Sequence, residues 1–178
     1  MADYILIRQK RKTISLEVRA GEIFIKAPMS MSEFEINEFI SRHTRFIEKR
    51  KAFYLTCEKQ KVFLSAEELK FLPARARILF EERVHFFAPL LGVAPKSIRI
   101  TSAKTRFGSC SGDNRLSFSK FTALLSPPLV DYIVVHELAH IKIKNHQSAF
   151  YALVASILPD YKVRQKQLKL EAPKYFWK

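Results

Sequence analysis

His136-Glu137-Leu138-Ala139-His140, with His146 six positions further on, is the most informative stretch of this sequence. An α-helix turns about 100° per residue, so residues four positions apart lie on the same face, one turn above the other. On a helix, His136 and His140 therefore point at the same place. Glu137 lies about 100° around the helix from His136, beside that place rather than on it. The spacing predicts two metal ligands with a carboxylate next to the metal.

His146 is the third candidate ligand, and it requires the helix to end first. Six residues of continuous helix would rotate His146 by about 240° net from His140 and point it away. The sequence predicts a stop between them, because Lys142 and Lys144 suit the carbonyl-rich end of a helix. Asn145 follows, and asparagine readily takes the left-handed conformation that ends many helices. Apolar residues beyond it predict a second helix, with His146 at or just before its start.

Three histidines and one carboxylate fit a catalytic zinc site. Zn²⁺ prefers four ligands, and catalytic sites usually supply three from the protein and leave one position open. His136, His140 and His146 complete such a set, and Glu137 is placed to act as general base on a metal-activated water. Three of the five histidines fall in this window, which favours a metal site over histidines that only pack or cap. The sequence predicts a zinc-dependent hydrolase, in the first place a peptidase acting on a protein or peptide.

Length and cysteine content indicate how the fold is stabilised and where in the cell the protein is expected. A chain of 178 residues can bury a core, so the metal need not hold the fold together. Cys57 and Cys110 are too few for a disulfide framework. The N-terminus lacks an apolar signal core, and no stretch approaches the roughly twenty apolar residues that cross a bilayer. We expect a cytoplasmic protein with no membrane partner.

The net charge leaves two other functions open. Lys and Arg number 31 against 17 Asp and Glu, a formal charge of +14 that attracts nucleic acid and other polyanions. The basic residues are dispersed along the chain, which favours solvated helix faces over a dedicated nucleic-acid surface. One alternative is a DNA-associated protease recruited through this basic surface. The other is a non-enzymatic, zinc-stabilised binding module.

Strand and helix signals occur in separate blocks. Alternating apolar and polar residues predict strands over 4–8, 13–19, 22–27, 97–102 and 115–119. The segment between the last two is rich in turn residues from Gly108 to Asn114. We expect an α+β fold with small antiparallel sheets, formed by a single domain over residues 1–178. Residues 1–60 can form a β-rich N-terminal subdomain within it.

Helix starts are marked by specific residues. Apolar periodicity predicts a helix from Ser32 towards Cys57. A capping box of Ser65 and Glu68 starts the next helix, which Pro73 is expected to kink or divide. Ser126-Pro127-Pro128 predicts the start of the helix that carries His136.

With these residues in view, the chain resembles the YgjP-like metallopeptidases, which are related to the SprT-like zincins. The resemblance runs through Arg11–Val18, Arg106–Cys110, Tyr132–His140, Asn145–Phe150 and Leu158–Tyr161. It implies a zincin-like fold in which the His-Glu-x-x-His helix packs against a sheet. It also implies that His136, His140 and His146 are the zinc ligands and that Glu137 is the catalytic acid/base.

One departure and three secondary candidates accompany this resemblance. The family usually has tryptophan where this chain has Phe107, so an indole N–H donor is lost. For Arg106 and Cys110 we favour structural roles, because a fourth protein ligand would close the open metal position. For Tyr132, packing is favoured over a role beside the metal ligands.

Overall fold

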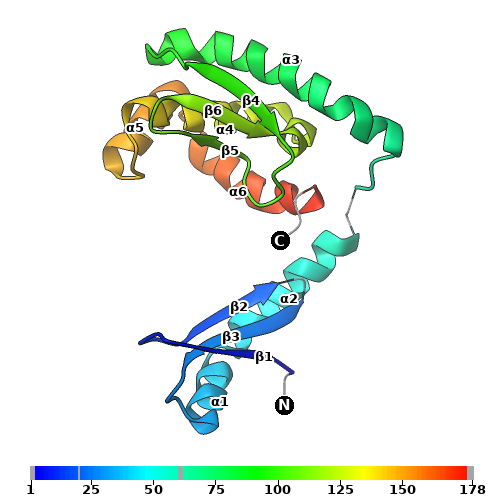
Figure 1. The fold of residues 1–178 in the computed structure, drawn as a ribbon, viewed down its shortest axis with the longest axis vertical. Helices are drawn as coiled ribbons and strands as arrows, with labels where there is room; N and C mark the ends of the chain where they lie inside the picture. The colour runs from blue at the N-terminus through cyan, green and yellow to red at the C-terminus, as the bar shows by residue number, and fades with distance from the viewer. Residues whose placement is uncertain (1–2, 20, 60–61, 176–178) are drawn as a thin grey trace. The chain divides into compact units, whose positions relative to one another are not determined.

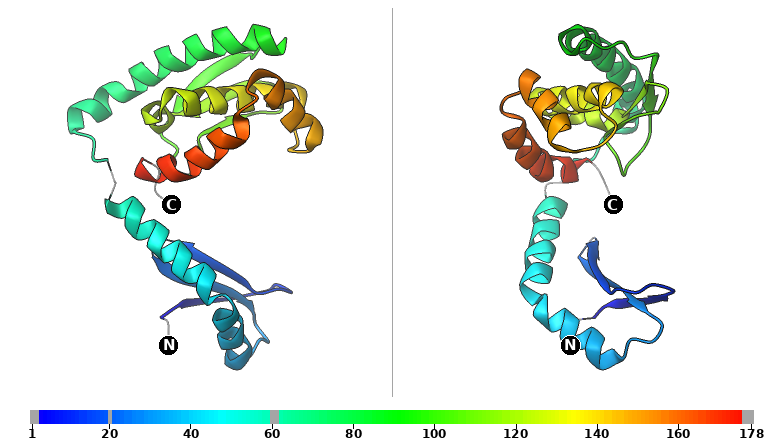
Figure 2. Two further views of the ribbon diagram at one scale, coloured as in Figure 1. Left: turned by 180° about the vertical axis from the view of Figure 1, so that it is seen from behind. Right: turned by 90° about the vertical axis from the view of Figure 1, so that its left-hand side faces the viewer.

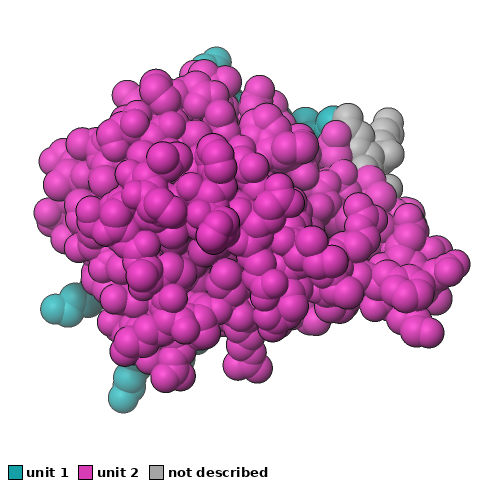
Figure 3. All heavy atoms as spheres, turned by 90° about the horizontal axis from the view of Figure 1, so that it is seen from above, with its two compact units in different colours: residues 1–60, 178 teal, residues 61–177 magenta. Residues whose placement is uncertain are grey.

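The computed structural model describes residues 3–19, 21–59 and 62–175, in two compact units (Figures 1 and 3). The N-terminal unit takes the chain up to residue 60, and the C-terminal unit takes it from residue 61 to residue 177. Each unit has its own sheet and its own hydrophobic core. None of the described helices has the length and apolar character needed to span a membrane.

The N-terminal unit is a three-stranded sheet with two helices. Its elements are β1 (Ile5–Gln9), β2 (Ser15–Arg19), β3 (Glu22–Pro28), α1 (Glu33–Arg42) and α2 (Thr44–Lys59). The predicted helix from Ser32 is two helices, because α1 ends at His43, whose Nδ1 lies 2.7 Å from the carbonyl oxygen of Phe39. The core of this unit lies between sheet and helices and contains Val18, Ile23, Ile25, Ala27, Ile36 and Ile47.

The C-terminal unit holds the second sheet and most of the helices. Its elements are α3 (Ala66–Leu91), β4 (Ser97–Thr101), β5 (Gly108–Cys110), β6 (Arg115–Ser119), the 3₁₀ turn η1 (Lys120–Leu124), α4 (Pro127–Lys142), α5 (Ser148–Ile157), α6 (Tyr161–Glu171) and η2 (Ala172–Lys174). The α+β class and the packing of the His136 helix, α4, against a sheet are confirmed.

The expectation of antiparallel sheets is wrong in one detail that both sheets share. The strand orders are β1-β3-β2 and β4-β6-β5, and each sheet pairs one parallel edge strand with an antiparallel hairpin. Alternation of apolar and polar residues predicts which face of a sheet each side chain lies on. It does not predict which strand is the neighbour, because the hydrogen bonds between strands join backbone groups. The sequence predicts a turn where the short strand β5 lies, because Gly-Ser-Cys has no alternation of apolar and polar residues.

Helix α3 begins as predicted and continues past Pro73. Ser65 Oγ accepts from the Glu68 amide while Glu68 Oε2 accepts from the Ser65 amide at 2.8 Å, which completes the capping box. The helix is not divided at Pro73 and runs to Leu91, ending at Gly92 in the left-handed conformation (φ 59°). Residues at three- and four-residue spacing bury one face and hold the helix in place despite the proline: Leu72, Ala76, Phe80, Val84 and Phe87.

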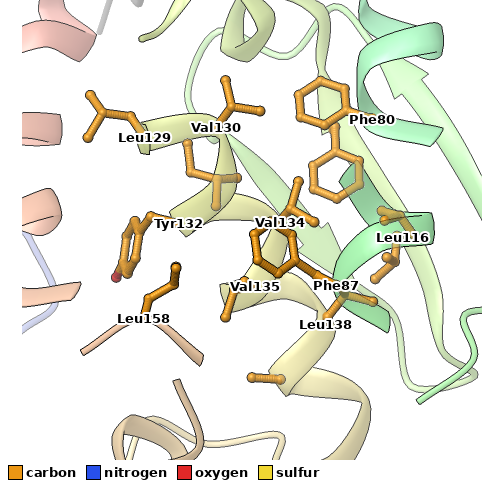
Figure 4. Close-up of a cluster of buried hydrophobic side chains, with 14 of the residues drawn as sticks. Phe80, Phe87, Leu116, Leu129, Val130, Tyr132, Val134, Val135, Leu138 and Leu158 are labelled. Carbon is orange, nitrogen blue, oxygen red and sulfur yellow. The ribbon is translucent and has the colours of Figure 1, made fainter. Parts of the chain in front are cut away.

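Helix α4 is the central element of the C-terminal unit. It contacts α3, β5, α5 and α6, and it lies among these elements in Figures 1 and 2. Its first helical residues are Pro127 and Pro128, as predicted, although Ser126 bonds the Glu171 carboxylate instead of capping the helix. Figure 4 shows the core around it, including Leu129, Val130, Val134, Val135 and Leu138. A helix buried on several sides is a rigid support for side chains at its end.

Candidate metal centre

The three predicted imidazoles lie together at the end of α4. The Nε2 atoms of His136 and His140 are 3.3 Å apart, and the Nε2 atom of His146 lies 3.1 Å from each of them. Zn–N bonds of about 2.0–2.1 Å at tetrahedral angles would place two ligand nitrogens about 3.3 Å apart. Three ring nitrogens that face one another have too few N–H donors to satisfy all three contacts by hydrogen bonding. The donor set fits a shared divalent cation.

The chain reaches this arrangement by ending α4 at Lys142. Ile143 is extended (φ −130°, ψ 107°), which suits a β-branched residue, and its amide still donates to the Ala139 carbonyl. The predicted left-handed Asn145 is wrong, since Asn114 is the one described non-glycine residue with positive φ. Asn145 Oδ1 instead accepts from the Gln147 amide at 3.2 Å. His146 lies just before α5, as predicted.

Each imidazole has a distinct environment. Nδ1 of His140 lies 2.9 Å from the Ile143 carbonyl oxygen, so this nitrogen donates and leaves the Nε2 lone pair free for a metal. Burial, with the nearby charges of His140 and His146, lowers the pKa of His136 to about 3 and keeps its ring neutral. His146 is exposed. A neutral ring is the form that binds a metal.

Phe150 supports all three rings at once. Its ring centroid lies 4.9 Å from that of His136, 4.5 Å from that of His140 and 4.9 Å from that of His146. The side chain is fully buried and belongs to α5. The sequence showed Phe150 only as an apolar position of that helix, and its contact with the histidines comes from the tertiary fold.

Lys144 fastens the connection that carries His146. Its Nζ donates to the Ser111 carbonyl oxygen at 3.0 Å and to Asn114 Oδ1 at 2.9 Å, both in the turn between β5 and β6. The sequence predicts Lys144 at the helix end, where it would interact with carbonyls of α4. The lysine instead joins two segments that lie more than thirty residues apart in sequence.

Glu137 follows His136 on α4 and is buried, with 7% of its surface exposed. Burial raises the pKa of Glu137 to about 7, and the positive charge of Arg106 opposes part of that rise. The carboxylate packs against the backbone of β5, where a Cβ atom on Gly108 would lie 2.8 Å from Glu137 Cγ. A carboxyl group with a near-neutral pKa can both take and give a proton at neutral pH.

The secondary candidates take different places. Cys110 is not part of the cluster of possible metal ligands found among the described residues, and burial raises the pKa of its thiol. The Tyr132 ring is buried, with its centroid 5.9 Å from that of His136, and its hydroxyl accepts from Gln165 Nε2 at 2.8 Å. Tyr132 therefore packs, and its hydroxyl is held within the protein.

Three histidines with converging ring nitrogens, and a buried carboxylate on the core helix that carries two of them, are the arrangement of a metal-dependent hydrolase. The family model for the YgjP-like metallopeptidase domain matches residues 58–171, and the chain belongs to this family. The match contains every residue of the candidate centre. Membership of a metallopeptidase family implies a divalent metal, which the three histidines could bind.

The individual relatives have low sequence identity to this chain. The UTP pyrophosphatase of Escherichia coli (strain K12) is 26% identical over 98 residues, which is 55% of this chain and 56% of that protein. The chain thus matches about half the length of this curated relative. Among solved structures, the metallopeptidase zymogen abylysin of Pyrococcus abyssi has a TM-score of 0.49 at 21% identity, covering 55% of this chain and 98% of that one. The zymogen jannalysin of Methanocaldococcus jannaschii has a TM-score of 0.45 at 25% identity, covering 51% and 92%.

Proposed function

We propose that the protein is a zinc-dependent peptidase in which His136, His140 and His146 hold the metal and Glu137 is the general base. The observation that carries this proposal is the convergence of three Nε2 atoms within 3.1–3.3 Å of one another, with a buried carboxylate on the helix that supplies two of them. Among the residues that the structure describes, the cluster has three nitrogen ligands and no fourth, which is the composition of a catalytic zinc site rather than a structural one.

The roles of the side chains follow from their surroundings. Bound zinc supplies Lewis acidity, which makes a water more acidic and polarises a scissile carbonyl. Glu137 accepts the proton of the attacking water and returns it to the leaving amine. Its pKa of about 7 suits both transfers. The bond from the Nδ1 nitrogen of His140 to the Ile143 carbonyl holds that ring in one tautomer.

The position of β5 supports a peptide substrate. This strand ends the β4-β6-β5 sheet, and its residue Gly108 touches Glu137. An extended peptide can add to the edge of a sheet through backbone hydrogen bonds. A peptide bound there would run alongside the general base.

A second candidate is hydrolysis of a phosphoanhydride bond, which the name of the Escherichia coli relative suggests. The observation in this chain that favours it is the positive charge of Arg106 next to Glu137. In this reaction water adds to a phosphorus atom, the anhydride P–O bond breaks, and the leaving phosphate takes the bonding pair. Glu137 takes the proton of the water, as in the peptidase reaction.

The test is a comparison of four purified proteins: wild type, Glu137→Gln, His146→Ala and His85→Ala. Elemental analysis should find about one zinc per chain in all but His146→Ala. Turnover of an unstructured protein and of nucleoside triphosphates is measured in parallel. Glu137→Gln should lose at least about a hundredfold in rate for the true substrate. His85 is an exposed histidine of α3, and its variant should match the wild type. Full activity of Glu137→Gln would reject the proposed role of the carboxylate.

A further inference from the structure

The open face of the second sheet carries an unusual set of side chains. Ile98, Ile100, Leu116 and Phe118 point into the core, so the alternate residues of β4 and β6 occupy the opposite face. The pairing of β4 with β6 sets Ser97 opposite Arg115 and Arg99 opposite Ser117, and β5 adds Ser109 opposite Ser117. Apart from Thr101 and the buried Ser119 at one end, the described residues of this face are serines and arginines across three strands.

This face forms a cavity of about 560 Å³, which we call the arginine hollow. Its lining consists of Ser97, Arg99, Arg106, Ser109, Cys110, Arg115, Leu116 and Ser117, together with Ser111 and Asp113 of the turn between β5 and β6. Every cationic side chain in its lining is an arginine, although the chain contains more lysines than arginines. Arginine presents a planar fork of donors that matches the oxygens of phosphate, whereas lysine is a point charge.

The charges of the hollow are only partly neutralised. Arg115 pairs with Asp113, with 2.9 Å between Nε and Oδ2, and Asp113 also accepts from Ser111 Oγ. Over the described residues, neither Arg99 nor Arg106 forms an ion pair. Three guanidinium groups therefore face a single carboxylate, with serine hydroxyls between them as further donors. This set of hydrogen-bond donors would bind an oxyanion.

The hollow adjoins the candidate metal centre through β5. Gly108 of this strand packs on Glu137, and the next residue, Ser109, lines the hollow. Arg106 lines the hollow and is also close enough to Glu137 to lower its pKa. A ligand with several linked phosphates could place one of them among the arginines and another beside Glu137.

We propose that the arginine hollow binds the phosphate groups of a nucleoside triphosphate. Binding requires only the hollow, whereas cleavage of the bound triphosphate would rest on the hydrolase function proposed above. The shared chemistry is a dense phosphate anion, which can come from a free nucleotide or from inorganic polyphosphate. A nucleic-acid backbone, with its spaced single charges, is a separate ligand, and an acidic peptide is another.

The experiment measures binding by titration calorimetry on metal-free full-length protein, so that no turnover occurs. The ligands are inorganic tripolyphosphate, UTP, a single-stranded dT oligonucleotide and a poly-glutamate peptide. The proteins are wild type, the double variant Arg99→Gln/Arg106→Gln, the charge-conserving Arg99→Lys, and Lys162→Gln. Lys162 is an exposed residue of α6, so its variant controls for the loss of one positive charge.

We expect tripolyphosphate and UTP to bind the wild type and Lys162→Gln with the same affinity within about twofold. The double variant should lose at least about tenfold, since each arginine lost removes charge-assisted hydrogen bonds. Arg99→Lys should fall between them, because it keeps the charge but not the fork. Equal affinity for UTP and tripolyphosphate would support recognition through the phosphate groups alone. Tighter binding of UTP would also support the proposal and would add a contact to the nucleoside.

Two results would overturn the proposal. The first is equal tripolyphosphate affinity in the wild type and the double variant. The second is tighter binding of the oligonucleotide or of poly-glutamate than of tripolyphosphate. The variant Glu137→Gln separates this proposal from the hydrolase function: even if it hydrolyses nothing, it should bind tripolyphosphate at least as tightly as the wild type, because it removes a negative charge near Arg106. Thermal unfolding of each variant checks that the exposed substitutions leave the fold intact.

Discussion

At the scale of single residues, Gly108 shows how closely Glu137 is enclosed. A Cβ atom at Gly108 would lie 2.8 Å from Glu137 Cγ and 3.0 Å from its Oε1. These distances are shorter than carbon and oxygen atoms tolerate without bonding, so the carboxylate would have to move. The glycine is thus required by the space that the Glu137 side chain occupies, and not by an unusual backbone angle.

Gly108→Ala should therefore impair catalysis without removing the metal ligands. We expect the rate to fall by about ten- to a hundredfold, because a displacement near 1 Å can cost a hundredfold. Overpacking should also lower the free energy of unfolding by about 1–3 kcal/mol. Kinetics, zinc content and urea unfolding check these three expectations.

Gly112 provides the matched control for this substitution. It lies four residues away, and a Cβ atom there would meet nothing within 4 Å. Gly112→Ala should keep wild-type activity. Equal activity of the two variants would contradict the tight contact between Gly108 and Glu137.

At the scale of elements, the connection between α4 and α5 decides where His146 lies. At its start, the Ile143 carbonyl accepts a hydrogen bond from His140. The next residue, Lys144, donates to the Ser111 carbonyl. Helical geometry can align His136 with His140, but it cannot align a residue beyond the helix end. The third ligand is therefore the one whose position depends on contacts outside its own segment.

Lys144→Met should weaken metal binding while leaving α4 intact. The substitution keeps the length of the side chain but removes the bonds to Ser111 and Asn114, so the connection loses its attachment. We expect the zinc affinity to fall about tenfold, at the low end for residues that support metal ligands. Competition with a chromophoric chelator measures it. Lys142→Met is the control, and an equal loss in both variants would argue against a specific role for Lys144.

The start of α3 gives a prediction with a defined pH dependence. The Ser65 bonds lower the pKa of Glu68 in the folded protein. A lowered folded pKa adds stability above the unfolded value, and this stability is lost as the pH falls through the folded pKa. Glu68→Gln, which keeps the Ser65 hydroxyl cap, should thus lower the free energy of unfolding at pH 7 and change it little under acidic conditions, where Glu68 is protonated. Urea unfolding at both pH values tests this, and a loss that is the same at both would contradict it.

At the scale of the whole molecule, the metal centre is added to a core that is already complete. The C-terminal unit buries large side chains from α3, β6, α4 and α5, such as Phe80, Phe118, Leu138 and Phe150. Phe80 and Phe118 stack with their ring centroids 4.3 Å apart. A core of this kind supplies the stability that small zinc modules take from their metal.

Metal removal should therefore lower stability without unfolding the protein. Chelation removes a ligand that binds only the folded state, so the melting temperature should fall by an amount that depends on zinc concentration. Far-ultraviolet circular dichroism of the chelated protein should keep its helical signal. Loss of that signal would favour the non-enzymatic, zinc-stabilised module over the hydrolase.

Two expectations at this scale stay predictions. One is that residues 1–60 act as a subdomain of a single metallopeptidase domain. The other is that the charge of +14 brings the protein to nucleic acid. Salt-dependent binding of duplex DNA that raises hydrolysis of DNA-bound proteins would support the second.

The sequence by itself determined the features that depend on neighbours within one or two helical turns. The spacing of His136 and His140, the capping box at Ser65 and the prolines that begin α4 are all of this kind. Each follows from helical geometry or from the amides at a helix start, which have no partner within the helix. Both are properties of a short segment. The family resemblance rests on the same local motifs.

Only the tertiary structure decided the features that join distant segments. The parallel pairing of β1 and of β4, the contact of Gly108 with Glu137, the tether of Lys144 and the packing of Phe150 are of this kind. The physical reason is that backbone hydrogen bonds are alike along the chain and that close packing is settled by shape. A residue's type says which bonds it can make, and the fold alone brings the partner within reach.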